Sequence, residues 1–409
     1  MIYSLAVWLY GGVIRLAAFF HPKAKAWVTG RKGLFRHIAA QYRKEGTTVW
    51  FHCASLGEFE QGRPVMEALK EKMPDIRIVL TFFSPSGYEV RKDYRGADHV
   101  FYLPLDTRRN ARRFVELIDP DLVVFVKYEF WYHFLRVLDE RRVPVVLISA
   151  IFRPEQWFFR WWGRWFLRMF RVYRKIFVQD DTSAALLRAR GIRQVEVAGD
   201  TRFDRVVAVA SSRKRIPVAE VFGADRTVVV AGSTWKEDET LLARYINARI
   251  RPYKWIIAPH EIHRTHLAWL KEQLKIPTLF YSEADKQRPE AAEVLIIDNI
   301  GMLSSLYAYG KVAYIGGGFG AGIHNILEAA VYGMPVLFGP RYEKFREAVE
   351  LVRRGGAFPV EDGESLESRL NLLYDDIPAR ERAAEIARTF VMESAGSTDV
   401  IVNNLLKLF

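Results

Sequence analysis

Two series of short apolar, β-branched segments run along the chain, and each alternates with segments of helical periodicity. The first series lies at 48–54, 76–83, 99–105, 122–127 and 143–150, with helical patterns at 58–72, 86–94, 107–118 and 130–141. The second lies at 226–233, 254–259, 293–298, 311–318 and 334–339, again with helices between. Near-continuous Val, Ile and Leu runs that alternate with helices are typical of parallel sheets covered on both faces. The pattern predicts an α/β protein with two Rossmann-like, doubly wound domains facing a cleft.

The boundary between these series falls in residues 211–225, which are charged and contain Pro and Gly. We interpret 211–225 as a linker, with one domain at 31–210 and the other at 226–409. In open α/β sheets, ligands bind beyond the carboxyl ends of the strands. Functional residues are therefore expected in the loops that follow the strands.

The N-terminal segment 2–20 is apolar apart from Arg15, and Gly11 and Gly12 interrupt it. A membrane span needs about 20 apolar residues, so this length is marginal. Basic residues follow it, which favours a cytoplasmic location for the rest of the chain. We predict that residues 1–30 form a membrane-associated segment, with the rest of the chain on the cytoplasmic side of that membrane; a buried core helix is the alternative.

A second unusual stretch, residues 153–175, mixes aromatic and basic side chains. On an α-helix, Arg160, Arg164 and Arg168 share one stripe, while Trp162 and Trp165 lie on the opposite side. A Trp face opposed to an Arg face is typical of a helix in a membrane interface. The alternative is a helix docked on the protein with its Arg stripe in solvent.

The charge and cysteine content narrow the choice of partners. Sixty Lys and Arg against 48 Asp and Glu leave a net charge of +12. This suits a nucleic acid, an acidic membrane surface or a phosphorylated substrate. Cys53 is the only cysteine, so an intramolecular disulfide and a Cys-based zinc site are excluded.

The clearest candidate for ligand binding is "IGGGFGAGIHNILEAA", residues 315–330. Glycines after a strand allow backbone N–H groups to approach a ligand, and a helix starting near Asn325 would point its positive end at the same place. The stretch lacks the Gly-Lys-Ser/Thr of a Walker A loop. A phosphate site is favoured over a purely structural turn, and Glu328 is placed to take a ribose hydroxyl.

Two carboxylates follow strands of the first series, Glu58 in "CASLGE" and Glu129 in "VKYEFW". Both lie at the same sheet edge, and Glu58 in the first turn of a helix is expected to stay ionised, as a general base must. A glycosidase acid/base pair or a Glu that merely complements a helix dipole are the alternatives. His260, His263 and His266 have a spacing compatible with metal ligands, but the sequence fixes no carboxylate partner for them.

With these residues, the chain resembles the 3-deoxy-D-manno-octulosonic acid (Kdo) transferases of lipopolysaccharide and lipid A biosynthesis. Five motifs carry the resemblance in the same order along the chain. They are Ala54–Glu58, Glu129–Trp131, Gly199–Asp204, Ala231–Thr234 with Glu239, and Gly322–Glu328 followed by "PVLFGP".

The resemblance implies a GT-B fold and an inverting, metal-independent glycosyltransferase. Its donor would be CMP-Kdo and its acceptor the tetraacylated disaccharide precursor of lipid A, with no further cofactor. Glu58 would be the general base, and Glu129 would belong to the same active site. The substrate-binding and CMP-binding positions would be Ser55, Gly57, Ser233, Thr234, Pro259, His260, Arg264, Ile300, Gly301, Met302, Gly317, Gly318, His324, Asn325, Ile326, Leu327 and Glu328.

The chain departs from the family pattern at several of these positions. His260 stands where the family usually has Arg, and Arg264 could substitute for it. Met302 stands where the family has Glu, while Ile323 and Ile326 replace a Gly and a Pro. These departures affect individual CMP contacts rather than the reaction class.

Two rival functions remain compatible with the sequence. One is another GT-B enzyme, a glycosyltransferase or an epimerase that acts on a UDP-sugar. The other is a basic, membrane-associated nucleic-acid-binding protein, which rests on charge alone. The basic residues cluster beside tryptophans in 153–175, so we expect an anionic membrane surface and no nucleic acid as partner.

Overall fold

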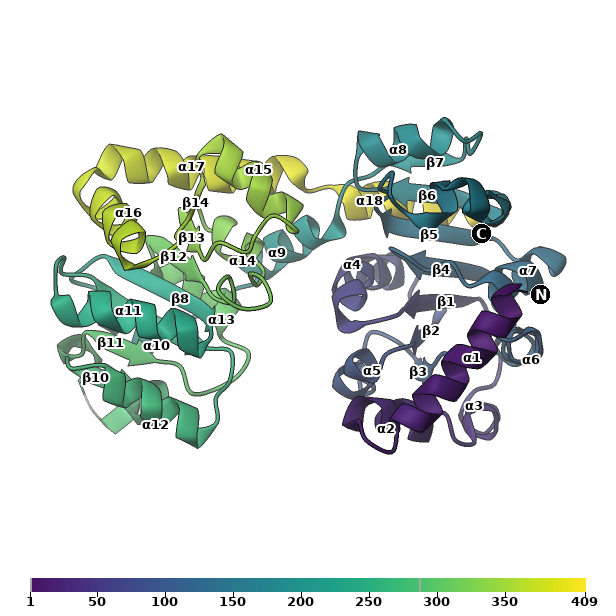
Figure 1. Cartoon of the computed structure of the whole chain (residues 1–409), viewed down its shortest axis with the longest axis horizontal. Helices are drawn as coiled ribbons and strands as arrows, with labels where there is room; N and C mark the ends of the chain where they lie inside the picture. Colours follow the sequence, from purple (N-terminus) through teal and green to yellow (C-terminus); the bar gives the residue numbers. More distant parts are fainter. Residues whose placement is uncertain (1, 287) are drawn as a thin grey trace. The chain divides into compact units, whose positions relative to one another are not determined.

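The computed structural model describes residues 2–286 and 288–409. Met1 and Gln287, which fall in the predicted segments 1–30 and 226–409, lie outside the described residues. The chain forms two compact units (Figure 1). Unit 1 comprises Met1–Arg205 and Ala395–Phe409, and unit 2 comprises Val206–Ser394.

Unit 1 is built on a seven-stranded parallel sheet of order β3-β2-β1-β4-β5-β6-β7. Its strands are β1 (Thr48–Cys53), β2 (Arg77–Phe82), β3 (His99–Tyr102), β4 (Leu122–Val126), β5 (Val145–Ala150), β6 (Tyr173–Val178) and β7 (Val195–Val197). Its helices are α1 (Ile2–Ala17), α2 (Pro22–Thr29), α3 (Leu34–Gln41), α4 (Leu56–Lys72), α5 (Pro85–Arg91), α6 (Arg108–Ile118), α7 (Tyr132–Glu140), α8 (Asp181–Arg188) and α18 (Ser397–Leu405). Short 3₁₀ segments are η1 (Trp157–Phe159), η2 (Trp161–Val172) and η6 (Leu406–Leu408), and α9 (Thr201–Ser211) crosses the boundary into unit 2.

Unit 2 repeats this architecture, with a seven-stranded parallel sheet of order β10-β11-β9-β8-β12-β13-β14. Its strands are β8 (Val228–Thr234), β9 (Lys254–Pro259), β10 (Thr278–Phe280), β11 (Val294–Ile296), β12 (Val312–Ile315), β13 (Val336–Phe338) and β14 (Ala357–Pro359). Its helices are α10 (Pro217–Phe222), α11 (Lys236–Ala248), α12 (Arg264–Gln273), α13 (Leu303–Leu306), α14 (Leu327–Ala330), α15 (Arg346–Arg354), α16 (Gly363–Asp375) and α17 (Ile377–Ser394), with 3₁₀ segments η3 (Tyr281–Lys286), η4 (Pro289–Ala291) and η5 (Tyr307–Tyr309).

All ten strands predicted from the apolar pattern are present, and both sheets are parallel as expected. The strand interiors are buried on both faces, which explains why they are apolar without alternation. Four further strands were missed. Three of them, β7, β10 and β14, are three-residue edge strands, too short to leave a pattern.

The largest departure from the predicted domain boundaries is the position of the C-terminal helix, which belongs to unit 1. The prediction placed 226–409 in one domain, whereas α18 packs on α4 in unit 1, with Ile401, Val402 and Leu405 in the same core cluster as Phe59. Asp204 fixes this return, because its carboxylate accepts hydrogen bonds from the N–H groups of Gly396 and Thr398 and from the Thr398 hydroxyl. Residues 211–225, predicted as a linker, include α10 and belong to unit 2.

The start of the chain folds onto unit 1. Tyr3 donates its phenolic proton to the buried Asp106 (2.5 Å), and the hydroxyl of Ser4 lies 3.0 Å from Nε2 of His133 on α7. Within residues 2–286 and 288–409, no single helix has both the length and the apolarity of a span; only Tyr3–Ala17 and Pro22–Thr29 together meet that test, with a 118° bend between them.

The predicted amphipathic α-helix at 153–175 is wrong in its helix type. The stretch forms η1 and η2, and Tyr173 already begins β6. At three residues per turn, positions three apart are eclipsed, so Gly163 and Phe166 face inward together. Gly163 is required there, since a Cβ atom would meet the carbonyl oxygen of Trp157 at 2.1 Å.

Candidate functional site

In each sheet the order in which successive strands are added reverses between two adjacent strands, which form the topological switch point. The candidate residues follow these two strands. In unit 1 the switch lies between the adjacent strands β1 and β4 (Figure 1). Glu58 follows β1 and Glu129 follows β4 in the sequence. In unit 2 it lies between β8 and β12, which are followed by Ser233–Thr234 and by Gly316–Gly318. Ligand sites of doubly wound sheets form at such switch points. Each unit therefore brings its predicted residues to the edge where a ligand site is expected.

Glu58 lies at the third position of α4, where its carboxylate turns back to the helix N-cap. Its Oε2 atom accepts hydrogen bonds from the backbone N–H of Ser55 (2.7 Å) and from the Ser55 hydroxyl (3.0 Å). This is the Ser-x-x-Glu capping arrangement, as the "SLGE" motif requires. Among the described residues, no hydrogen bond is made to the other oxygen, Oε1. One oxygen holds the side chain in place, and the other is available to a substrate.

Glu129 is buried at the end of β4, within a set of aromatic and polar side chains. Its Oε2 atom accepts a hydrogen bond from the indole N–H of Trp131 and lies 2.9 Å from Nε2 of His52. The other ring nitrogen of His52, Nδ1, lies 2.8 Å from the hydroxyl of Thr81. The phenol of Tyr173 donates to the backbone carbonyl of Glu129. The side chain of Glu129 is thus held in place by its neighbours rather than mobile at the surface.

The pKa of Glu58 is raised to about 7, first by burial and then by the charge of Glu129. The hydrogen bonds from Ser55 lower the pKa but do not outweigh these two effects. The expectation that a first-turn position keeps Glu58 fully ionised is therefore wrong near neutrality. General-base catalysis favours a pKa close to the pH of the reaction. At that pKa a useful fraction of the carboxylate is ionised, and the ionised form binds a proton more strongly than an ordinary carboxylate does.

In unit 2, a bulge ends β8 and brings two backbone segments into contact. Ser233 has a left-handed φ of 53°, and the pairing of β8 with β9 shifts register between Gly232 and Thr234. A Cβ atom at Gly316 would meet the carbonyl oxygen of Ser233 at 2.3 Å. The first glycine of the loop is therefore needed for backbone packing and not for a ligand.

Buried polar side chains contact Thr234, the last residue of β8. The hydroxyl of Thr234 donates to Oε1 of Glu239 (2.8 Å), and Nε2 of His266 lies 2.9 Å from Oε2 of the same carboxylate. Burial raises the pKa of Glu239. This side of Thr234 is occupied by protein, so any ligand contact at this position involves the backbone.

Asp238 connects the loops after β8 and β12. Its carboxylate accepts hydrogen bonds from the N–H of Trp235 (2.9 Å), the N–H of Gly317 (2.9 Å) and the phenol of Tyr314 (2.8 Å). The sequence-based interpretation did not single out Asp238. Trp235-x-x-Asp238 does not match the Ser/Thr-x-x-Glu capping pattern, so no local signal marked Asp238.

The helix after the glycine loop is short. α14 has only four residues, and it begins at Leu327, close to the start predicted near Asn325. The side chains of Ile326 and Leu327 are buried, whereas Asn325 is exposed and its amide donates to Glu328 (3.2 Å). A four-residue helix has little macrodipole, so the predicted attraction of its N-terminus for phosphate is not supported.

Three aromatic rings from three loops gather at the edge of the unit 2 sheet. The indole N–H of Trp235 donates to Nε2 of His324 (2.9 Å), and the two rings are nearly parallel at 11°. The ring of His260 stacks on both, with a centroid separation of 4.5 Å in each case. Trp235 was not among the predicted site residues.

The remaining predicted positions of unit 2 differ in how accessible they are. Pro259 ends β9 and is buried, whereas Arg264 at the start of α12 is exposed. Ile300 is 85 % exposed, and Gly301 next to it has a left-handed φ of 89° with open space around it. Met302 is partly buried at the N-cap of α13. Gly317 and Gly318 are buried, and a Cβ atom at either would meet backbone atoms within 2.6 Å.

The histidines at 260, 263 and 266 do not come together as metal ligands. His260 stacks on Trp235, His266 pairs with Glu239, and His263 caps α12. Within the described ranges, no three His, Cys, Asp or Glu side chains form a group that could hold a metal ion.

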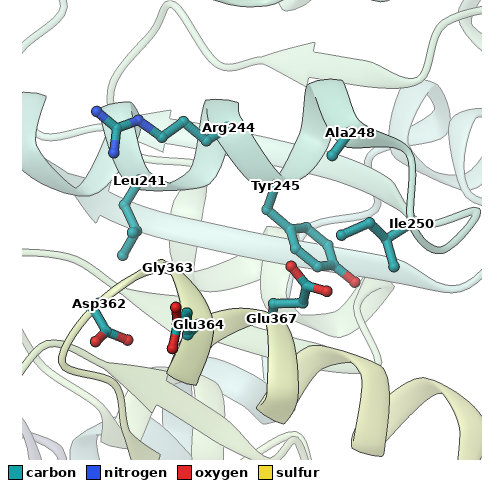
Figure 2. Close-up of a pocket in the computed structure, with 9 residues that line it drawn as sticks. All are labelled: Leu241, Arg244, Tyr245, Ala248, Ile250, Asp362, Gly363, Glu364 and Glu367. Carbon is teal, nitrogen blue, oxygen red and sulfur yellow. The ribbon is translucent and has the colours of Figure 1, made fainter.

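A surface pocket of about 360 Å³ lies between α11 and the start of α16 (Figure 2). Arg244 and Tyr245 line it from α11, while Glu364 and Glu367 line it from α16. None of the predicted site residues contributes to it. The pocket is therefore separate from the sheet-edge residues of unit 2.

The predicted membrane-contact residues are exposed together rather than on opposite faces. The side chains of Arg160, Arg164 and Arg168 face solvent, and so do Trp162 (53 % exposed) and Trp165 (44 % exposed). The buried residues of η2 are Gly163, Phe166 and Phe170. Trp165 contacts Tyr132 on α7, and Tyr132 contacts Tyr3 of α1, with ring centroids 5.8 Å and 5.3 Å apart.

Comparison with solved structures defines the class of protein. UDP-GlcNAc 2-epimerase from Neisseria meningitidis superimposes with a TM-score of 0.63 at 17 % identity, over 88 % of this chain and all of that one. A glycosyltransferase from Rickettsia africae gives a TM-score of 0.55 at 11 % identity, over 90 % of this chain. The two parallel α/β units therefore have the GT-B type of fold.

Comparison with protein families is more specific. Residues 29–205 match the model of the 3-deoxy-D-manno-octulosonic-acid transferase (kdotransferase) family. The 3-deoxy-D-manno-octulosonic acid transferase of Aquifex aeolicus is 27 % identical over 83 % of this chain and 90 % of its own length. The enzyme of that name from Bordetella pertussis is 28 % identical over 86 % of this chain. The chain is thus similar to Kdo transferases over most of its length, as its motifs indicated.

Proposed function

We propose that the protein is an inverting glycosyltransferase that moves Kdo from CMP-Kdo to the tetraacylated disaccharide precursor of lipid A. The observation that carries the proposal is the environment of Glu58. One oxygen of this carboxylate is held by Ser55, the other is free, and its pKa lies near 7. Similarity to Kdo transferases supplies the sugar and the donor, and the sheet-edge loops of unit 2 supply backbone groups for the nucleotide.

The proposed reaction is a single displacement. Oε1 of Glu58 takes the proton of an acceptor hydroxyl, and the hydroxyl oxygen attacks the anomeric carbon of Kdo. The bond from that carbon to the phosphate oxygen breaks, and its electron pair leaves with CMP. The charge of Glu129, fixed by His52 and Trp131, keeps the proton affinity of Glu58 high enough for this transfer. We expect no metal to be needed.

The direct test is incubation with CMP-Kdo and the tetraacylated disaccharide, followed by mass spectrometry of the lipid and measurement of released CMP. We expect a mass increase of Kdo units and stoichiometric CMP. Calorimetric titration with CMP and with UDP distinguishes the rival UDP-sugar enzyme. Binding of UDP in preference to CMP, or a folded protein that transfers no sugar, would contradict the proposal.

Substitution of Glu129 should change the pH dependence of the reaction. In the wild type we expect kcat/KM to rise with pH through about 7 as Glu58 ionises. Glu129→Gln removes a negative charge that raises the pKa of Glu58, so the midpoint should move to lower pH. Rates measured from pH 5 to pH 9 check this. A midpoint that stays in place or moves upward would show that Glu129 does not act on Glu58.

We also propose that unit 1 docks on the anionic inner membrane through two surfaces. One is the exposed face of α1 with Leu5, Leu9, Val13 and Leu16, whose spacing forms an apolar helical stripe. The other is the exposed Trp and Arg side chains of η2. Contacts through Tyr132 join the two. Each basic residue near such a membrane contributes about 1 kcal/mol.

Charge reversal tests this docking. Arg160, Arg164 and Arg168 are exposed, and no described residue forms an ion pair with them. Changing all three to Glu should release the protein from anionic vesicles in a sedimentation assay. Reversal of three exposed arginines of unit 2, Arg353, Arg382 and Arg388, is the matched control and should leave binding unchanged. Equal binding of both triple variants would refute the assignment of this surface.

A further inference from the structure

Trp235, an aromatic side chain at the edge of the unit 2 sheet, makes a directional contact with a proposed CMP-binding residue. Its indole nitrogen lies 2.9 Å from Nε2 of His324. An indole N–H can only donate, so Nε2 of His324 must be the acceptor and carry no proton. The neutral His324 ring then has its proton on Nδ1. The contact therefore fixes the tautomer of His324.

The ring of His324 is held in this orientation from several sides. It lies against Gly317, where a Cβ atom would come within 3.1 Å of its Cδ2 atom. His260 covers the plane of both His324 and Trp235 at centroid separations of 4.5 Å. The backbone of Trp235 is in turn fixed by Asp238, which also binds the N–H of Gly317.

The free edge of His324 is the one that carries Nδ1. No described residue forms a hydrogen bond with Nδ1, whereas Nε2 is occupied by the indole. Burial and the neighbouring His260 lower the pKa of His324, so the neutral ring is the dominant form near pH 7. The site thus presents an uncharged N–H donor beside the glycine loop.

We propose that Trp235 is a positioning residue of the donor site, which holds His324 as the Nδ1–H tautomer so that this N–H can donate to the nucleotide. The inference rests on the proposed function, since it takes the ligand to be a pyrimidine nucleotide. It adds a residue that lies outside the motifs linking this chain to its family. It also assigns a role to the side chain of His324 rather than to its backbone.

The test uses the full chain labelled with ¹⁵N-histidine. Long-range ¹H–¹⁵N spectra of the wild type, assigned with His324→Gln, should show a protonated Nδ1 and an unprotonated Nε2. Trp235→Phe keeps the aromatic ring but loses the donor, so this signature should disappear. The pKa of His324 should also rise, because the hydrogen bond favours the neutral form.

Calorimetric titration with CMP supplies the second measurement. Loss of one positioned hydrogen bond should weaken CMP binding by about fivefold to tenfold in Trp235→Phe. The matched control is Trp269→Phe, because Trp269 also contacts a histidine of unit 2, His266, at 5.7 Å. The control should keep both the tautomer of His324 and the affinity for CMP.

Distinct outcomes would overturn this inference and the proposed function. A proton on Nε2 of neutral His324 in the wild type would overturn the inference without any variant, even if Trp235→Phe fails to fold. Unchanged CMP affinity in folded Trp235→Phe would also overturn it. If the wild type binds UDP and not CMP, the donor proposal fails, while the tautomer measurement still decides what Trp235 does.

Discussion

Glu58→Gln should slow the transfer of Kdo at least about 10²-fold, because glutamine cannot accept the proton of the attacking hydroxyl. Glutamine also serves in a capping box, so the start of α4 should persist. The raised pKa means that ionised Glu58 costs the folded state stability above its unfolded pKa, and the cost is complete above about pH 7. The melting temperature of the variant at pH 8 should therefore be no lower than that of the wild type.

The matched control for this prediction is Glu60→Gln on the same helix. Glu60 pairs with Arg91 at 2.9 Å on the surface of α4 and is not near the capping contact. We expect its turnover to stay within about threefold of the wild type, since surface ion pairs contribute little. Full activity of Glu58→Gln, or an equal loss in both variants, would exclude Glu58 as the general base.

Asp238→Ala should have the largest effect on unit 2. Three donors, the N–H groups of Trp235 and Gly317 and the phenol of Tyr314, lose their shared acceptor in a buried position. Unsatisfied buried donors cost about 1–3 kcal/mol each, so we expect a loss of about 4 kcal/mol. This corresponds to a fall of about 10 °C in the melting temperature of a unit of this size. CMP binding should weaken more than about tenfold, since both loops lose their common anchor.

Glu237→Ala is the control for this second prediction, because Glu237 is exposed on the same turn of α11. It should leave both melting temperature and CMP affinity unchanged. Asp238→Asn, which keeps one acceptor oxygen, should fall between the wild type and the alanine variant. A melting temperature of Asp238→Ala that matches the wild type would show that the three hydrogen bonds do not support the loops.

The strands and the edge of the sheet that carries the candidate residues could be predicted from the sequence. Buried parallel strands are mostly apolar, so β1, β4, β8 and β12 were visible as short apolar runs rich in aliphatic or aromatic residues. Because chemistry in such folds follows the strand ends, Glu58, Glu129 and the glycine loop could be placed before any coordinates. The family motifs pointed to the same positions.

Other features depend on contacts between residues far apart in the chain. The side chains of Trp235, His260 and His324 meet only because β8, β9 and β12 are neighbours in the sheet. His52 becomes the partner of Glu129 in the same way, across the pair β1 and β4. No local pattern marks such contacts: the motifs pointed to His260 and His324, but not to Trp235 or to the pairing of His52 with Glu129.

The sequence by itself determined the local features of the protein: which segments are strands, where these strands end, and which motifs follow them. Tertiary structure decided the pKa of Glu58, which helix-terminus reasoning placed too low, since burial and Glu129 outweigh the local hydrogen bonds. It also decided that α18 returns to unit 1 and that residues 157–159 and 161–172 form 3₁₀ segments. The physical reason is the same in each case, because burial and charge interactions are set by neighbours in space and periodicity records only neighbours along the chain.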